Sequence, residues 1–382
     1  MKITEVRATP VSIPATRTCT WSFGRSYGHT RTIVEVMTDD GRIGLGEASL
    51  ARVALMINDE FAPRLAGIDP YEISTARRAC LREHRDFGYL ADSTAEMAFS
   101  AVEIALWDLI GQDRKLPLYR VLGGAVRERA PFVAYAYTVA LEEGHTEAEV
   151  PEIMAGIAAK SIAATGATLF EFKVGRHSVA CDIATVKAIR AAVGPRIELA
   201  VDANMAFGIE QARQFLAGTA DVLGGIEEPV AALAEMVLLR REFPVPVSTH
   251  CTDIEKLRGY PEIDDIVGDI NVDGGISGIV RLAAAVRSYD RRFWLRSNGE
   301  TGIGWAAMCH LGMACEALDR PGQALIDWIE DDLVEGDCWL VREGGVRPPD
   351  KPGLGVELDR DSFRHYAERY RAHGAFTRYD AP

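Results

Sequence analysis

Six polar or charged residues recur at near-regular intervals through the middle of this sequence, and each one closes a short apolar stretch. Successive members are 29, 25, 23, 23 and 23 residues apart. Residues of these types can bind a metal ion, remove a proton or hold an anion, so their chemistry depends on whether the fold brings them together. The six residues are Lys173, Asp202, Glu227, His250, Asp273 and Arg296.

Asp202, Glu227 and His250 close three consecutive stretches and form the predicted metal site. Two carboxylates and an imidazole on neighbouring strands can converge on one cation. The carboxylate oxygens favour Mg²⁺ or Mn²⁺, and the imidazole shifts the preference towards Mn²⁺, Co²⁺, Ni²⁺ or Zn²⁺. Each residue taken alone could instead cap the helix that follows it. Three of them in the same register favour a shared cation site over three separate caps.

Lys173 ends the stretch Leu169–Lys173 and is the candidate general base. A free lysine has a pKa of about 10.4, so a base that works near neutrality needs a lower value, which a nearby metal cation would supply. Glu171 lies two residues earlier and therefore on the same face of the strand, where it would favour the charged ammonium instead. A structural ion pair of Lys173 with Glu171 or with Asp202 is the alternative interpretation.

Asp273 and Arg296 close the last two of the six stretches. Arginine cannot act as an acid or a base at ordinary pH, so Arg296 can contribute only hydrogen bonds and positive charge. Its sharper role would be to hold a substrate carboxylate through two guanidinium N–H groups. Its plainer role would be an ion pair with Asp273. The sequence leaves both roles open.

The elements that must position these residues change character near residue 130. Before that point, strand patterns come first and helical patterns follow, which predicts an α+β unit. The expected elements of this unit are strands at 2–13 and 31–48, a hairpin turn at Asp39-Asp40-Gly41, and helices at 50–66, 70–85 and 94–112.

After residue 130, short apolar strands alternate with helices, which predicts βαβ units and a parallel sheet. Near-even spacing of the polar strand ends favours a TIM-like barrel, where these ends meet at one mouth, over a doubly wound sheet, where they spread along an edge. The expected strands are 132–137, 169–173, 197–202, 222–227, 245–250, 266–273 and 293–297, with helices at 180–192, 210–216, 231–243, 278–288 and 305–316.

Composition limits the possible functions. The chain has 382 residues, enough for a barrel of about 250 residues and a second domain. A net charge of −14 argues against nucleic-acid and anionic-membrane surfaces, although a small anionic substrate stays compatible. No apolar run approaches the roughly 20 residues of a membrane span. The seven cysteines are scattered, odd in number and form no CxxC pair, which is typical of a reduced, cytoplasmic protein.

Several segments, in their order and spacing, resemble the enolase superfamily in its mandelate racemase/muconate lactonizing branch, and glucarate dehydratases most of all. They are Thr30–Val34, Gly41–Glu47, Val102–Gly111, Phe172–Gly175, Val201–Asn204, Ile226–Pro229 and Lys351–Glu357. The resemblance covers most of the chain. It implies an N-terminal α+β capping domain at 1–125, a modified (β/α)₇β TIM barrel at 126–344, and a C-terminal segment at 345–382 that completes the cap.

The resemblance also implies roles for individual residues. Asp202 and Glu227 carry over as ligands of Mg²⁺, with His250 in the third ligand position, and Lys173 carries over as the second lysine of a Lys-x-Lys base motif. Family members remove the proton α to a carboxylate, stabilise the enolate with the metal, and are often symmetric oligomers. The segment 21–31 falls where the family has a mobile specificity loop. The residues expected at the substrate are His29, Arg31, Tyr135, Glu171 and Asn204.

Three positions depart from the family pattern. Glu171 replaces the first lysine of Lys-x-Lys, His250 replaces an acidic or amide ligand, and Arg296 stands where these dehydratases and racemases carry histidine. Its usual partner in the pattern, Asp273, is present. Because arginine cannot replace the histidine as base or acid, two-base racemisation is disfavoured.

The predicted function is therefore a one-base, metal-dependent dehydratase of an acid sugar that gives a 2-keto-3-deoxy acid. Lys173 would be the base, and Lys173, Tyr135 or Tyr137 would supply the acid. An epimerase or cycloisomerase of another carboxylate substrate is one alternative. A non-catalytic ligand-binding relative is the other, because all three departures also fit the drift of an abandoned active site.

Overall fold

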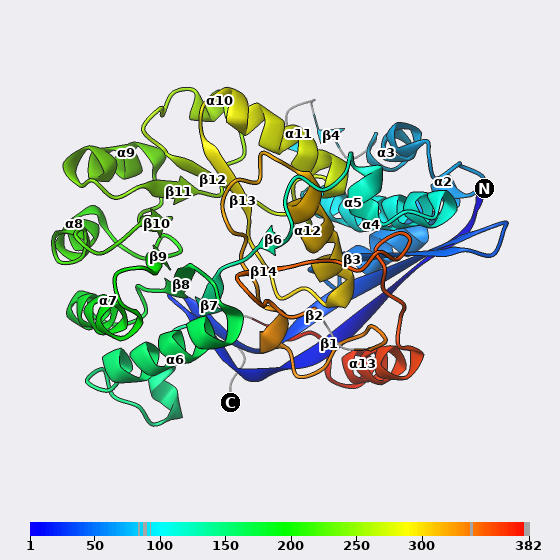
Figure 1. The fold of residues 1–382 in the computed structure, drawn as a ribbon. Coiled ribbons are helices and arrows are strands. Elements are labelled where there is room, and N and C mark those ends of the chain that lie inside the picture. The colour runs from blue at the N-terminus through cyan, green and yellow to red at the C-terminus, as the bar shows by residue number, and fades with distance from the viewer. Residues whose placement is uncertain (83–84, 87–89, 92, 337–338, 378–382) are drawn as a thin grey trace.

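The computed structural model describes residues 1–82, 85–86, 90–91, 93–336 and 339–377. They form two packed parts (Figure 1). One part, the cap, is an antiparallel sheet with helices, and the other, the barrel, is a curved parallel sheet surrounded by helices. Within these described residues, no helix is both long and apolar enough to cross a membrane.

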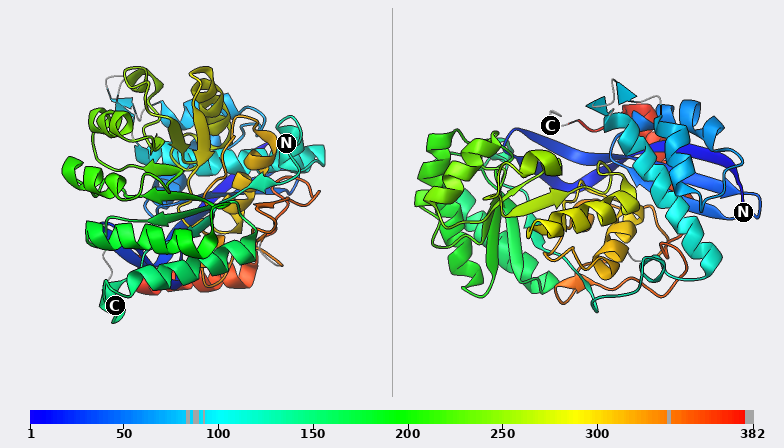
Figure 2. Two further views of the ribbon diagram at one scale, coloured as in Figure 1. Left: turned by 60° about the vertical axis from the view of Figure 1, so that its left-hand side comes forward. Right: turned by 90° about the horizontal axis from the view of Figure 1, so that it is seen from above.

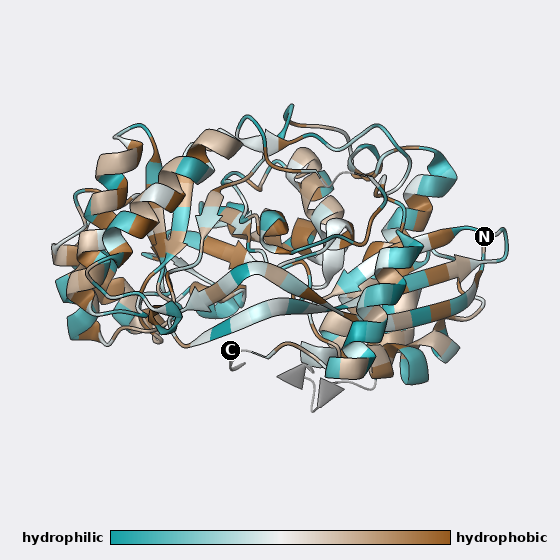
Figure 3. Ribbon diagram, turned by 90° about the horizontal axis from the view of Figure 1, so that it is seen from below, coloured by the Kyte–Doolittle hydropathy of each residue, from teal (hydrophilic) through white to brown (hydrophobic). Residues whose placement is uncertain are grey.

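The cap is built on a three-stranded antiparallel sheet of β1 (Ile3–Trp21), β2 (Gly24–Thr38) and β3 (Ile43–Ala48). The predicted hairpin turn is confirmed, and Gly41 adopts the positive φ of 84° there. β1 and β2 extend well beyond the predicted strands and meet at a tight turn. Their far ends form a long ribbon that leaves the cap and reaches the barrel (Figures 2 and 3).

Helices pack on this sheet, and α4 (Ser93–Arg114) is the longest of them. It lies very close to β3. The short distance is seen at Gly46, where an added Cβ atom would stand 1.9 Å from the carbonyl oxygen of Ala101. The other helical elements of the cap are α1 (Val53–Met56), the π-helical turn η1 (Ile57–Phe61), α2 (Ala62–Leu65), α3 (Ile73–Leu81) and α5 (Leu118–Val121). The short strands β4 (Arg85–Asp86) and β5 (Leu90–Ala91) pair with each other. Residues 83–84, within the predicted helix 70–85, lie outside the described residues.

Seven parallel strands follow one another around the barrel, each hydrogen-bonded to the next. They are β7 (Ala134–Ala136), β8 (Leu169–Lys173), β9 (Glu198–Asp202), β10 (Gly225–Glu227), β11 (Val247–Thr249), β12 (Asp265–Gly268) and β13 (Arg292–Leu295). The surrounding helices are α6 (Val150–Thr165), α7 (Val179–Val193), α8 (Ile209–Ala217), α9 (Leu233–Glu242), α10 (Ile254–Leu257), α11 (Gly275–Ser288) and α12 (Gly302–Ala314), with the 3₁₀ turn η2 (Leu141–Glu143). Strand–helix alternation is thus confirmed.

The segment around Gly322 and Gln323 takes the eighth strand position. Gly322 bridges Phe132 in parallel, and its carbonyl accepts the Val133 N–H at 2.9 Å. On the other side, the Gln323 N–H donates to the carbonyl of Leu295, at the end of β13, also at 2.9 Å. This segment therefore lies between the last and first strands of the sheet, and the modified (β/α)₇β barrel is confirmed.

Two buried carboxylates of the cap accept hydrogen bonds from backbone N–H groups in the first turns of two barrel helices. Glu47 accepts the N–H of Thr301 at 2.9 Å and of Gly304 at 2.7 Å, at the start of α12. Glu103 on α4 accepts the N–H of Ile276 at 2.8 Å, and that of Ser277 at 2.9 Å, at the start of α11. Carboxylates in this position satisfy N–H groups that have no partner within the helix and oppose the positive end of its dipole. These contacts attach the cap to the barrel.

The C-terminal segment returns to the cap as expected. Its elements are α13 (Arg360–His373) and the strand β14 (Gly345–Val346), which pairs with β6 (Ala130–Pro131), and the 3₁₀ turn η3 (Ile326–Trp328) precedes it. α13 packs beside β1, and the Ser12 hydroxyl donates to the carbonyl of Gly374 at 2.9 Å. The Leu354 N–H donates to Asp108 at 2.7 Å, and its carbonyl lies 3.0 Å from Nε2 of His310. The boundaries at residues 125 and 344 stay a prediction.

Candidate active site at the barrel mouth

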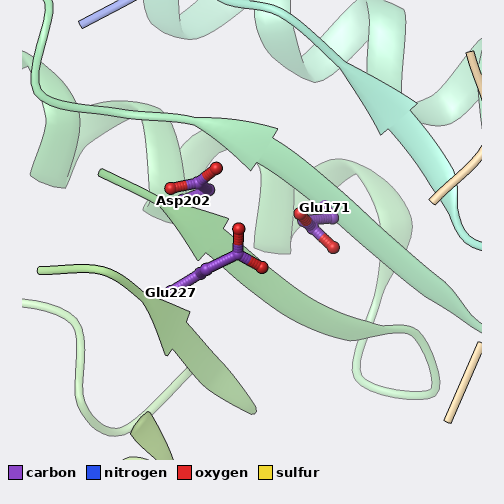
Figure 4. A group of neighbouring side chains, drawn as sticks. All are labelled: Glu171, Asp202 and Glu227. Atoms are coloured by element: carbon purple, nitrogen blue, oxygen red, sulfur yellow. The ribbon is translucent and has the colours of Figure 1, made fainter. Parts of the chain in front are cut away.

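Three buried carboxylates from neighbouring strands meet inside the barrel. Glu171 lies on β8, Asp202 ends β9 and Glu227 ends β10, and the register of these strands brings the three into line. One oxygen from each residue lies within 4.8 Å of the other two, and Figure 4 shows the three groups facing a common space. We call these residues the triad. Asp202 and Glu227 thus lie together, as their strand-end positions predict. Glu171, which the sequence places at the substrate, joins them in the same cluster.

The triad is suited to a divalent cation. The three residues are 1–4% exposed, and Oε2 of Glu227 has no hydrogen-bond partner among the described residues. Burial raises the pKa of all three carboxyl groups, and the charges of Glu227 and Asp202 raise that of Glu171 further. A cation with oxygen ligands would offset the repulsion between the three carboxylates and would be coordinated by the free Glu227 oxygen.

Lys173 lies at the end of β8, beside the triad. Its ammonium contacts the Asp202 carboxylate, and it also lies 5.9 Å from the centre of the Tyr135 ring. The side chain is mostly buried, with 11% of its surface exposed. The ion pair with Asp202 anticipated as a structural alternative is present, and it also directs the amine towards the triad. Lys173 as a base stays a prediction.

His250 contacts the triad through one member only. Its Nε2 lies 2.8 Å from Oε1 of Glu227, and its backbone N–H donates to Glu228 at 2.7 Å. Burial and the charge of Arg296 lower the pKa of His250 to about 4, so the imidazole is neutral at physiological pH. A neutral imidazole can bind a metal or hold a ligand carboxylate in place. Its role as third ligand stays a prediction, with Glu171 as the competitor for that position.

The prediction that Asp273 ends the sixth strand is wrong, and the ion pair with Arg296, one of the two roles left open for that arginine, is made by Asp269 instead. β12 ends at Gly268, and Arg296 donates to Asp269, with Nη2 and Nε at 2.6 and 2.8 Å from the same oxygen. The chain turns there because the Asp269 carboxylate accepts the N–H of Asn271 at 2.8 Å, which replaces the next strand hydrogen bond. Asp273 instead accepts from the Asp269 N–H and from the Thr252 hydroxyl.

His29 and Arg31 lie on β2, so the expected loop over 21–31 is wrong for most of that range. Arg31 is 1% exposed and pairs with Glu47 at 2.5 Å, which argues against direct contact with a substrate. The His29 ring packs on Gly299, in the loop after β13. Burial and the charge of Arg31 lower the pKa of His29 to about 4. His29 therefore reaches the barrel from the ribbon as a neutral imidazole.

Tyr135 lies near Lys173, and Asn204 contacts Asp202 of the triad. Tyr135 is buried on β7, and burial raises the pKa of its hydroxyl well above the ordinary value, so it stays protonated. Asn204 adopts a positive φ of 46°, and its backbone and side-chain N–H groups donate to Asp202 at 2.8 and 2.9 Å. Asn204 therefore positions a residue of the triad. Its contact with a substrate stays a prediction.

Gln323 is a residue of the site that the sequence reasoning missed. Its side-chain amide donates to Glu171 at 2.5 Å, while its carbonyl oxygen accepts the Ser297 N–H at 3.2 Å. It follows Arg296 by 27 residues, which continues the spacing of the polar strand ends. That interval could have predicted Gln323 from the sequence, although the short eighth strand lacks the apolar run that marks the other strands. Asp269, also missed, gave no such signal.

A capped barrel with a lysine and clustered carboxylates at its strand ends has the arrangement of a barrel enzyme, whose active site lies at this end of the strands. Comparison with known families gives the same class. Residues 3–123 match the N-terminal domain of mandelate racemase/muconate lactonizing enzymes, and residues 154–362 match the enolase C-terminal domain-like family. The chain belongs to the mandelate racemase/muconate lactonizing enzyme family of the enolase superfamily.

Individual relatives have different activities. A probable glucarate dehydratase of Streptomyces coelicolor is 29% identical over 371 residues, covering 89% of this chain and 85% of the relative. Muconate cycloisomerase 1-1 of Acinetobacter lwoffii is 28% identical, covering 93% and 94%. The structure of an enolase from Thermobispora bispora, complexed with magnesium and formate, is 27% identical with a TM-score of 0.89, covering 98% of this chain and 95% of that one.

Proposed function

We propose that this protein is a divalent-metal-dependent hydro-lyase that converts an acid sugar to a 2-keto-3-deoxy acid. The observation that carries the proposal is the position of Lys173 beside three buried carboxylates, one of which has an unpartnered oxygen. Similarity to a probable glucarate dehydratase supports the dehydratase reaction, and the magnesium and formate bound to a relative support the cofactor and the carboxylate ligand.

Asp202 and Glu227 would hold the cation, with Glu171 or His250 as the third ligand. A bound Mg²⁺ or Mn²⁺ would stabilise the negative charge that develops on the substrate carboxylate when the α-proton leaves. Lys173 would remove that proton, because its amine is directed to this position by Asp202. In this proposal the carboxylates bind the metal, and the neighbouring Lys173 removes the proton.

The second step, loss of the β-hydroxyl, requires a proton donor. Lys173 is protonated after the first step and could return its proton to a hydroxyl on the same face of the substrate. Tyr135 is the other candidate, since its hydroxyl is held in the protonated form by burial and its ring lies beside Lys173. Arg296 is 32% exposed and can hold the substrate by hydrogen bonds, whereas it cannot supply the second base of a racemase.

The proposal is tested by the products that form in D₂O. The purified protein would be incubated with a library of mono- and diacid sugars and Mg²⁺ or Mn²⁺, and products would be read by NMR. The expected result is the signal of a 2-keto-3-deoxy acid for at least one substrate. The same reaction with the metal removed by a chelator is the control, and it should give no product.

Two other results would replace the proposal. Deuterium at the α-carbon without dehydration would retain Lys173 as base and indicate an epimerase or a cycloisomerase, in line with the muconate cycloisomerase relative. No reaction, together with no bound metal in the purified protein, would indicate a non-catalytic binding protein. Metal content by elemental analysis separates this last outcome from a missing substrate.

A further inference from the structure

A cavity of about 570 Å³ lies between α6 and the C-terminal segments 324–327 and 340–342, with part of β7 in its wall. No residue of the triad lines it. The position follows from the barrel topology, because the eighth strand leads into η3 rather than into a helix that would pack against α6. Tyr135, a candidate proton donor of the proposed reaction, contributes to the wall, so the cavity adjoins the candidate active site, whereas neither Lys173 nor the triad lines it.

The wall of this cavity is largely apolar. Ile153 and Ile157 contribute from α6, and Ile326 and Leu340 contribute from the C-terminal segments. Gly156 lies between the two isoleucines, and a Cβ atom placed there would have no heavy atom within 4 Å. Cavities of roughly 300–1,000 Å³ with apolar walls are typical of sites for small organic ligands.

The charged residues of the cavity give it a net positive charge. Lys160, Arg342 and Arg17 line it together with a single acidic residue, Asp327, which interacts with Arg17. Neither Lys160 nor Arg342 has a carboxylate partner among the described residues, although Arg342 donates to a backbone carbonyl. A local excess of cations in a chain of net charge −14 is a specific local feature rather than a property of the whole surface.

We propose that this cavity binds an amphipathic organic anion, a molecule with an apolar body and a carboxylate, sulfate or phosphate head. The isoleucines and Leu340 would cover the body, and Lys160 and Arg342 would pair with the head. A bound molecule would also contact Arg17, whose guanidinium lies 3.8 Å from the centre of the Trp328 ring. Trp328 in turn contacts Tyr137, and the aromatic residue that lines the cavity itself is Tyr135.

The probe for the test is octyl sulfate below its micelle concentration, with 1-octanol as the uncharged probe of equal chain length. Binding to the full-length protein would be measured by isothermal titration calorimetry. We expect saturable binding of one octyl sulfate per chain, and binding of octanol weaker by about tenfold or more. Equal affinity for the two probes, or no binding of either, would overturn the proposal.

A substitution that fills the cavity can be compared with a matched substitution outside it. Gly156→Leu places a side chain in the open space and raises helix propensity, so it should fold and lose octyl sulfate binding. Ala159→Leu adds the same side chain on the same helix at a position that does not line the cavity, and it should bind like the unaltered protein. Retained binding in Gly156→Leu would place the ligand elsewhere and overturn the proposal.

The charge of the wall is tested in the same titration. Lys160→Glu combined with Arg342→Glu should weaken octyl sulfate by about tenfold or more and leave octanol nearly unchanged. Lys187→Glu, on the exposed face of α7, is the control and should change neither affinity. If neither probe binds the unaltered protein and Gly156→Leu changes the sedimentation coefficient, the cavity is an interface between copies of the chain, which rejects the proposal.

Discussion

Buried carboxylates occur in two regions of this molecule, and their surroundings differ. At the junction of cap and barrel, Glu47 and Glu103 receive N–H groups of helix N-termini, and Glu47 also pairs with a guanidinium. At the mouth, Glu171, Asp202 and Glu227 face one another, with one amine and an unpartnered oxygen among them. The junction carboxylates hold the fold together, whereas the unpartnered Glu227 oxygen leaves the triad able to accept a ligand.

The largest expected effect is on catalysis at the mouth. Lys173→Met removes the proposed base and should lower turnover by about 10²–10⁴-fold, while calorimetric binding of Mn²⁺ is retained. Lys187→Met, on the exposed face of α7, is the matched control and should keep full turnover. Normal turnover in the Lys173 variant would remove this residue from the mechanism.

The junction should respond in stability. Glu47→Gln removes the nearer carboxylate partner of the buried Arg31 guanidinium and leaves Glu300 at 3.8 Å, and it should lower the free energy of unfolding in urea by about 3–5 kcal/mol. Combining it with Arg31→Met should recover part of the loss, because the poorly paired buried charge is then gone. Glu152→Gln, exposed on α6, should change stability by less than about 0.5 kcal/mol. A similarly small change in Glu47→Gln would mean that the junction is not stabilised by this pair.

A third effect depends on pH at the other end of the junction. Burial lowers the pKa of His310 to about 4, whereas an unfolded chain has a value of about 6.5. The neutral imidazole therefore stabilises the fold above pH 6.5, and this contribution is lost as pH falls towards 4. Between pH 7 and pH 5 the loss should be about 2 kcal/mol in the free energy of unfolding.

The variant His310→Gln tests this contribution. Its amide can donate to Leu354 and accept from the Tyr119 N–H as the imidazole does, without titrating. It should show a smaller fall in stability between pH 7 and pH 5 than the unaltered protein. His373→Gln, at the exposed end of α13, should leave the pH dependence as it was. Equal pH dependence in all three proteins would assign the effect to other groups.

The smallest effect sharpens the contrast between the regions. Without metal, Glu227→Gln removes one of three mutually repelling buried charges and should raise the free energy of unfolding by about 1–2 kcal/mol. The same variant should lose the rise in melting temperature that Mn²⁺ gives the unaltered protein. If it is destabilised without metal, the triad is a structural network like the junction.

The barrel and three of its polar strand ends could be predicted from the sequence. Strand ends at Lys173, Asp202 and Glu227 were readable because each follows an apolar run whose length matches a strand. Asp269 was missed because apolar residues continue past Gly268, and only a side-chain hydrogen bond at the turn ends the strand there. Such a local competition between side chain and backbone is invisible to hydrophobic periodicity.

Other parts of the site depend on long-range pairing. Gln323 belongs to a strand that is defined by its neighbours at Phe132 and Leu295 rather than by its own sequence. The ribbon that carries His29 extends past Pro14, where the pairing shifts register, so a local reading ends the strand too early. Both features arise from contacts between segments far apart in the chain, which single-sequence patterns do not record.

The packing of α13 beside β1 has a consequence for synthesis. The cap is assembled from segments far apart in the chain, and its strands β1 and β2 are made long before the helix α13 that covers β1. At ordinary translation rates the interval is on the order of tens of seconds. During that time β1 and β2 expose apolar surface to the ribosome, to chaperones and to other nascent chains, so the cap is the part of this protein most dependent on protection before release.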